Sequence, residues 1–242
     1  MEFLTSPEFW VALGQIIVID ILLGGDNAVV IALACRKLPP AQRRKGIVLG
    51  TAGAIILRVV LIAFAMTLLD IPFLKVVGAG LLVWIGAKLL SPEDEGHDGI
   101  QGSDRLWAAV RTIIVADLVM SVDNVIAIAG AAQNAGEHAL LLVVLGLLIS
   151  IPIIVWGSQL VIRLMERYPV IVTAGGMLLG WIAGGMLATD PALADPARWQ
   201  WMPKLPPGDA IPYAASAAGA LLVLAIGKAA ARRRAARGGV AG

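Results

Sequence analysis

Histidine, cysteine and charged residues are scarce in this sequence, and each shortage excludes a class of site or fold. Of 242 residues, Cys35 is the single cysteine, and His97 and His138 are the two histidines. An internal disulfide is therefore excluded, and the thiolate and imidazole ligand sets that hold Zn or Cu are missing. Charged residues make up 15% of the chain, against about 25% in soluble domains, which excludes an ordinary soluble globule.

Apolar residues are abundant instead: they make up 59% of the chain, and its mean hydropathy is +0.85. Seven apolar runs approach or exceed the roughly 17 to 25 residues that a helix needs to cross a bilayer. They cover residues 9–34, 46–69, 72–90, 106–132, 139–162, 168–188 and 210–229. The runs lack the alternation of a membrane barrel. The sequence therefore predicts an all-α membrane protein with seven transmembrane helices in the lipid bilayer.

The positions of the basic residues predict the orientation of these helices. A basic cluster follows the first run (Arg36, Lys37, Arg43, Arg44 and Lys45), and another, 232–237, ends the chain. The positive-inside rule places both clusters in the cytoplasm, which leaves the N-terminus outside and the C-terminus inside. No cationic region precedes the first apolar run, so we expect that helix to remain in the mature protein. We expect no nucleic-acid partner.

An internal repeat relates the two halves of the chain. The segment IIVIDILLGGDNAVVIA from Ile16 matches IIVADLVMSVDNVIAIA from Ile113 without a gap, and LLVWI at Leu81 matches LLGWI at Leu178 with the same offset of 97 residues. The repeat aligns Asp20, Asp26 and Asn27 with Asp117, Asp123 and Asn124. Because each half has three spans, the second half crosses the membrane in the opposite sense. We therefore predict a 3+3 inverted-topology repeat plus a C-terminal helix, as in many transporters.

This repeat defines the predicted organisation of the chain. The predicted parts are a first three-helix repeat (9–90), an acidic cytoplasmic linker (91–105), a second three-helix repeat (106–188), an extracytoplasmic loop (189–209) and a seventh helix with a basic cytoplasmic tail (210–242). The acidic linker is interpreted as a solvated connection, with a metal-collecting patch as the alternative. Trp199 and Trp201 of the loop are expected at the membrane interface.

Aspartates within the predicted spans are the strongest functional signal. A charged side chain at the centre of a spanning helix costs roughly 2.5 to 3.5 kcal/mol, so four would cost on the order of 10 kcal/mol. The four are Asp20, Asp26, Asp117 and Asp123. They could be protonated, paired with protein cations or paired with mobile cations. Arg58 and Arg111 can neutralise at most two, and the two remaining charges match one divalent ion.

The spacing indicates where these groups converge. Positions seven apart share a helix face, so Asp20 and Asn27 lie on one stripe, as do Asp117 and Asn124. The Gly24-Gly25 pair could break the first helix and free backbone carbonyls as further ligands. Ser121 and Val122 replace these glycines in the second half, so we expect a milder break there and two unequal sites.

Oxygen ligands at depth favour hard cations. Carboxylate, amide and carbonyl oxygens suit Mg²⁺, Ca²⁺ and Mn²⁺ rather than Zn²⁺ or Cu²⁺, and geometry that the sequence does not give would decide among them. Buried carboxylates can also exchange protons for a metal ion, which makes proton coupling a hypothesis.

The paired D-x5-DN motifs, the basic first loop and the three-plus-three organisation resemble the TerC family of bacterial integral membrane proteins, most closely its YjbE-like branch. The resemblance covers residues 9 to about 188. It implies kinship with LysE-type exporters, an association with tellurium resistance, manganese efflux across the inner membrane, and metal supply to exported enzymes. By this resemblance the candidate metal ligands are Asp20, Asp26, Asn27, Asp117, Asp123 and Asn124, supported by Gly24, Gly25, Ser121 and Arg58.

The leading hypothesis is therefore a divalent cation exporter, with Mn²⁺ favoured over Mg²⁺ and Ca²⁺, working by alternating access and without enzymatic activity. One alternative is a membrane partner that metalates exported enzymes at the protein-export machinery. Another is an exporter of a different solute, such as an amino acid. An intramembrane aspartyl protease is the least favoured, because paired Asp-Asn motifs fit ligation better than a catalytic dyad. The sequence leaves the oligomeric state open.

Overall fold

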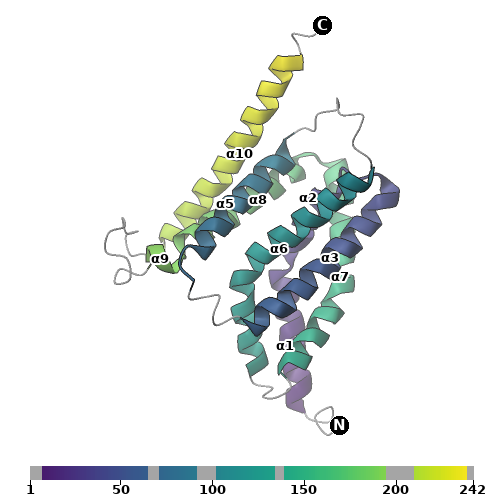
Figure 1. The fold of residues 1–242 in the computed structure, drawn as a ribbon, viewed down its shortest axis with the longest axis vertical. Coiled ribbons are helices and arrows are strands. Elements are labelled where there is room, and N and C mark those ends of the chain that lie inside the picture. Colours follow the sequence, from purple (N-terminus) through teal and green to yellow (C-terminus); the bar gives the residue numbers. More distant parts are fainter. Residues whose placement is uncertain (1–6, 65–70, 92–101, 134–138, 195–209, 239–242) are drawn as a thin grey trace. The chain divides into compact units, whose positions relative to one another are not determined.

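The computed structural model describes residues 7–64, 71–91, 102–133, 139–194 and 210–238, and its regular elements are all helices (Figure 1). The helices are α1 (Pro7–Leu23), α2 (Gly25–Cys35), α3 (Pro40–Ala63), α5 (Leu74–Leu90), α6 (Gly102–Gln133), α7 (Ala139–Arg167), α8 (Val170–Ala188), α9 (Pro191–Ala194) and α10 (Ala210–Gly238). The predicted all-helical class is confirmed for this part of the chain.

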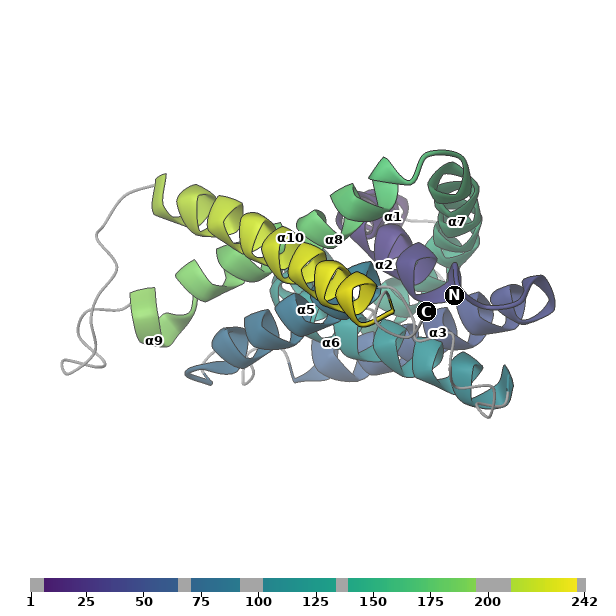
Figure 2. The same ribbon diagram turned by 90° about the horizontal axis from the view of Figure 1, so that it is seen from above.

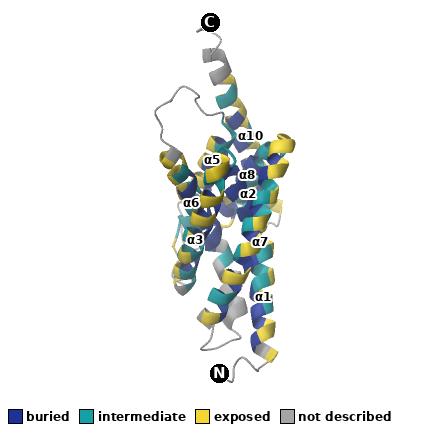
Figure 3. Ribbon diagram, turned by 90° about the vertical axis from the view of Figure 1, so that its right-hand side faces the viewer, coloured by how far each residue is buried: buried dark blue, intermediate teal, exposed yellow. Residues whose placement is uncertain are grey.

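Several of these helices are long and apolar enough to cross a membrane. Within the described residues, α3, α7, α8 and α10 meet this condition, and α1 with α2 forms a fifth candidate span, bent by 46°. Large apolar side chains such as that of Leu22, 75% exposed, are exposed on these helices, as expected where lipid covers them. Figure 3 marks all exposed residues in yellow. α5 and α6 coincide with the two other predicted spans, and the count of seven stays a prediction.

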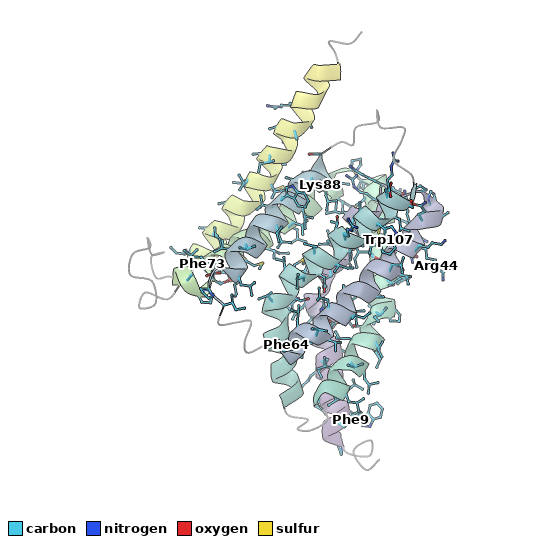
Figure 4. All side chains as sticks on the ribbon, viewed as in Figure 1. Phe9, Arg44, Phe64, Phe73, Lys88 and Trp107 are labelled. Carbon is cyan, nitrogen blue, oxygen red and sulfur yellow. The ribbon has the colours of Figure 1, made fainter. Side chains whose placement is uncertain are left out.

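Two helices begin earlier than the apolar runs that predicted them. α3 begins at Pro40 rather than at residue 46, so the basic cluster is only partly a loop and Arg44 lies exposed near the start of the helix (Figure 4). Proline at the first helical position favours this early start. Arg43 stabilises it by donating from Nε to the Leu38 carbonyl and from Nη2 to the Arg36 carbonyl, both at 2.9 Å. α6 begins at Gly102, inside the predicted linker 91–105, of which residues 92–101 lie outside the described part.

Two helix ends also extend beyond the predicted spans. α7 continues to Arg167 rather than residue 162, and α10 continues to Gly238 rather than 229, so the basic tail is helical as far as it is described. Residues 195–209, which include most of the predicted external loop and both of its tryptophans, lie outside the described residues.

The chain divides into two compact units that do not follow its linear order. The first unit comprises residues 1–70 and 105–163, and the second comprises residues 71–104 and 164–242. Each unit therefore takes helices from both predicted halves of the repeat. The division of the chain at a linker of residues 91–105 stays a prediction.

In the first unit, α1 packs on α7, and α6 lies beside α3 (Figures 1 and 2). A core of Phe9, Leu13 and Ile16 meets Leu142 and Leu147, and a Cβ at Gly50 of α3 would lie 2.5 Å from the Ile113 Cδ1 of α6. Because Gly50 has no side chain, α3 can approach α6 closely at this point.

Gly24 separates α1 from α2, which confirms the predicted break in the first span. Glycine is needed there because a Cβ would lie 2.5 Å from the Asp20 carbonyl oxygen and 3.2 Å from the Ile154 Cδ1. The expectation of freed carbonyls fails at Gly24 itself, since its carbonyl accepts the Ala28 amide at 3.1 Å. The bend therefore redirects α2 without leaving this oxygen as a ligand.

In the second unit, α5, α8 and α10 pack on one another (Figure 2). A Cβ at Gly184 of α8 would overlap the Ala215 carbonyl of α10, and a Cβ at Gly180 would overlap the Gly219 carbonyl. Backbone-to-backbone packing of this kind is common between membrane helices, because small residues allow it.

The second unit also contains a buried carboxylate that fixes the start of α5. Asp190, 0% exposed, accepts the backbone amides of Phe73 at 3.2 Å, Lys75 at 3.1 Å, Val76 at 3.2 Å and Ala192 at 2.7 Å. Phe73 adopts a left-handed conformation with φ of 64° and lies beside α9 (Figure 4). Asp190 thus satisfies amides at a helix N-terminus, where a negative charge is favourable.

Candidate functional site

One guanidinium joins two buried aspartates inside the first unit. Arg58 of α3 donates from Nη1 to the Oδ1 of Asp20 on α1 at 2.5 Å, and from Nη2 to the Oδ1 of Asp117 on α6. The three residues are between 1% and 6% exposed. The two aspartates occupy equivalent positions of the sequence repeat. In the fold they bind different terminal nitrogens of the same guanidinium, that of Arg58.

Two serines complete the hydrogen bonding of this cluster. Ser121 accepts from Arg58 Nε at 3.1 Å and donates to Asp117 Oδ2 at 3.0 Å, one turn along α6. Ser150 of α7 donates to Asp20 Oδ2. Each carboxylate oxygen therefore has one donor and keeps further acceptor capacity. With both aspartates and Arg58 ionised, the cluster has a net charge of −1.

A cavity of about 20 Å³ adjoins the cluster. Its polar lining consists of Asp20, Asn27, Thr51, Arg58 and Asp117, and its apolar lining of Val30, Ile31, Ala54, Ile55, Ile113 and Ile154. A cavity of this size has room for one water molecule or one small ion.

Two side chains that line this cavity have no hydrogen-bond partner in the described part of the chain. Both polar atoms of the Asn27 amide and the hydroxyl of Thr51 are buried and unpaired, in residues that are 5% and 4% exposed. Because a buried polar group without a partner costs about 1 to 3 kcal/mol, such groups are rare in folded proteins. Their position on one cavity points to a polar or charged occupant.

The fold brings together about half of the residues that the sequence singled out. Asp20, Asn27, Asp117 and Arg58 line the cavity, and Ser121 connects Arg58 to Asp117. Gly24 lies one helical turn after Asp20, at the bend that separates α1 from α2. These residues form the candidate site.

The other predicted residues that the structure describes do not line the cavity. Asp26 is half-buried and does not line the cavity; it lies in the first turn of α2, where its Oδ1 accepts the backbone amide of Asn27 at 2.8 Å. Gly25 is exposed, with open space where a Cβ would be. Asn124 is half-buried and does not line the cavity, and the side chain of Asp123 lies outside the described residues. Arg111, the other candidate cation, is exposed.

Sequence reasoning missed two members of the site, Thr51 and Ser150. Each is a polar residue inside an apolar run, which is a signal that could have been noticed. Hydroxyls can bond within their own helix, however, so the sequence does not reveal which of them face a cavity.

The described residues contain no group of three or more His, Cys, Asp or Glu side chains that could hold a metal ion. An ion at this cavity would therefore rely on two carboxylates and on the neutral oxygens of Asn27 and Thr51.

The TerC family of integral membrane proteins matches residues 5–235 of the chain. The chain belongs to the TerC family. Among its relatives, the uncharacterized membrane protein YjbE of Bacillus subtilis (strain 168) is 46% identical to this chain. The matched region covers 77% of this chain and 84% of YjbE. YceF of the same organism is 30% identical, covering 75% of this chain and 72% of YceF.

The inner membrane protein YoaE of Escherichia coli (strain K12) is 29% identical to this chain. The matched region covers 71% of this chain and 36% of YoaE. No solved structure gives a significant match. Family membership and the helices described above make this chain an integral membrane protein with bacterial inner-membrane relatives.

Proposed function

We propose that this TerC-family protein transports divalent metal ions, Mn²⁺ foremost, out across the bacterial cytoplasmic membrane by alternating access coupled to protons. One observation carries the proposal: Asp20 and Asp117 converge on a cavity whose other polar walls, Asn27 and Thr51, have unpaired oxygens. These atoms lie within apolar helices, where an unneutralised carboxylate is costly. A mobile cation would satisfy the charge and the unpaired oxygens together.

The chemistry of the wall atoms supports a hard cation. Carboxylate, amide and hydroxyl oxygens are the ligands that Mn²⁺, Mg²⁺ and Ca²⁺ accept, whereas soft metals prefer sulfur and imidazole. The cluster's net charge of −1 attracts cations. Asp26, Asp123 and Asn124 are proposed as further ligands along the path of the ion.

Two competing functions fit this cavity less well. An amino acid brings a carboxylate of its own, and Arg58, the cation that lines this cavity, already holds Asp20 and Asp117. An aspartyl protease needs two carboxyl groups that share a proton directly, whereas Arg58 lies between Asp20 and Asp117.

The predicted architecture and membrane orientation are also part of the proposal. We infer a 3+3 inverted repeat related to LysE-type exporters, an external N-terminus and a cytoplasmic C-terminus. The interleaved units, each built from helices of both halves, support this inference because duplicated halves commonly pack together around a shared site.

Flux through the purified protein in liposomes tests the proposal. We expect Mn²⁺ movement with the wild-type protein and at least a tenfold loss with Asp20→Asn or Asp117→Asn. Asp104→Asn is the matched control, because Asp104 is exposed at the start of α6. Wild-type flux that persists in both cavity variants would reject the proposed site.

The same flux assay tests Asp26 and Asp123 as ligands, and it tests the alternative that the protein is a membrane partner that metalates exported enzymes. Asp26→Asn and Asp123→Asn are expected to abolish flux while insertion is preserved. A protein that binds Mn²⁺ through Asp20 and Asp117 yet moves none in liposomes would instead be a membrane partner that metalates exported enzymes.

A further inference from the structure

The strongest cation contacts of the candidate site are already made by the protein itself. Arg58 holds Asp20 and Asp117 with its two terminal nitrogens and Ser121 with Nε, so three of its donors are directed at this cluster. The unpaired oxygens of Asn27 and Thr51 nevertheless line the same cavity as the guanidinium. The site therefore combines a resident cation with ligands that it does not use.

The charges show why a resident cation and a divalent ion oppose each other here. With Arg58 in place the cluster carries −1, and adding a divalent ion would bring it to +1 in a buried site. If Arg58 moves away, two carboxylates and one divalent ion are neutral. Because charge is costly in a medium of low dielectric constant, the neutral combination is favoured.

We propose that Arg58 is a tethered counter-cation that the transported ion displaces: it neutralises Asp20 and Asp117 when the site is empty and releases at least one of them when the ion binds. This inference rests on the proposed function. The ion takes the released carboxylate oxygen together with Asn27 Oδ1 and Thr51 Oγ. When the ion leaves, Arg58 returns and the empty site avoids bare buried charge.

The serines fit this exchange. Ser121 and Ser150 hold the Oδ2 atoms of Asp117 and Asp20, while Arg58 holds the two Oδ1 atoms. Loss of Arg58 would therefore free one oxygen of each carboxylate without releasing its orientation. Arg58 also has a long side chain, which can rotate without any movement of the α3 backbone.

A permanent structural role for Arg58 predicts a different response to mutation. If Arg58 only organises the carboxylates, its removal weakens ion binding. If it competes with the ion, its removal strengthens ion binding, although the transport cycle then slows because the ion leaves a doubly charged site.

Mn²⁺ titration of the purified protein in nanodiscs distinguishes the two roles, with thermal unfolding as the check of folding. Arg58→Gln is expected to lower the Kd for Mn²⁺ at least tenfold and to reduce flux in liposomes. Arg58→Lys keeps the charge but cannot bridge both carboxylates, so its Kd should fall between those of Arg58→Gln and wild type. A folded Arg58→Gln protein that binds Mn²⁺ with wild-type or weaker affinity would overturn the proposal.

A charge-matched double variant covers the case in which Arg58→Gln does not fold. Asp117→Asn alone should bind Mn²⁺ at least tenfold more weakly than wild type, and Asp117→Asn with Arg58→Gln restores the net charge of −1 and should regain most of that loss. No recovery in the double variant would contradict competition. Wild-type protein that neither binds nor transports Mn²⁺ would instead refute the proposed function, and the exchange with it.

Discussion

Two buried carboxylate sites in this molecule are neutralised in different ways. In the second unit, Asp190 is held by four backbone amides, from Phe73, Lys75, Val76 and Ala192. In the first unit, Asp20 and Asp117 are held by the side chains of Arg58, Ser121 and Ser150. Backbone amides cannot leave without disrupting their helix, whereas side chains can rotate away. The hydrogen bonds of Asp190 are therefore fixed by the backbone, whereas Asp20 and Asp117 can exchange the side chains that bind them.

The unpaired groups strengthen this contrast. Within the described residues, Asn27 and Thr51 leave polar atoms unsatisfied at the first site, while the four hydrogen bonds given above for Asp190 all come from backbone amides. Incomplete hydrogen bonding is a cost that a purely structural site has no reason to keep. The following predictions test the contrast, in order of decreasing effect on stability.

Removing the resident cation should have the largest effect on stability. Arg58→Gln leaves Asp20 and Asp117 without their counter-charge, so we expect the free energy of unfolding to fall by about 3 to 5 kcal/mol without metal. Equilibrium unfolding in mixed micelles measures this loss. Saturating Mn²⁺ should recover part of it, and a variant that metal does not stabilise would break the distinction between exchangeable and fixed sites.

Asp190→Asn should destabilise the protein by about 2 to 3 kcal/mol, since an amide nitrogen would replace an oxygen that accepts backbone N–H groups. The same unfolding measurement applies, and Asp104→Asn is the exposed control, expected to change stability by about 0.5 kcal/mol or less. Saturating Mn²⁺ should stabilise Asp190→Asn as much as it stabilises wild type. A variant that loses the stabilisation by Mn²⁺ would place the metal at the second unit instead.

Ser150→Ala removes the donor to Asp20 Oδ2 and should cost about 1 to 2 kcal/mol. Ser158→Ala is the matched control on the same helix, because both hydroxyls are buried and contact a carbonyl three residues back at 2.9 Å, Leu147 for Ser150 and Val155 for Ser158. Ser150 has the contact to Asp20 in addition. Thermal unfolding compares the two. Equal losses would mean that Ser150 does not serve the carboxylate.

Thr51→Val should have the smallest effect on stability and a clear effect on binding. Its hydroxyl has no partner, so we expect the unfolding free energy to change by less than about 0.5 kcal/mol. The Kd for Mn²⁺ should rise by about three- to tenfold, because one proposed ligand is lost. Thr112→Val on α6, whose hydroxyl donates to the Ala108 carbonyl, should leave the Kd unchanged.

Much of this organisation was readable from residue patterns. Long apolar runs predicted helices at nearly every described position, because the backbone must satisfy its own hydrogen bonds in lipid. The Gly24-Gly25 pair predicted the break after α1, and the repeat singled out Asp20 and Asp117. Helix ends were less accurate: Pro40 and Gly102 begin helices earlier than hydropathy indicated, since polar first turns carry no apolar signal.

The partners of the aspartates were harder to predict. A seven-residue spacing placed Asn27 on the same stripe as Asp20, and the cavity includes both. The same reasoning could not place Asp26, which lies in the first turn of α2 after the bend, or select Thr51 and Ser150 from the other hydroxyls.

The sequence by itself determined that the chain is helical and membrane-embedded and that it carries duplicated aspartates in apolar surroundings, because hydropathy and repeats are properties of the linear chain. Only the tertiary structure decided that Arg58 lies between Asp20 and Asp117, that Asn27 and Thr51 stay unpaired beside them, and that Asp190 caps α5. These contacts join residues up to 117 positions apart, and their geometry depends on how the helices pack rather than on any local preference of the chain.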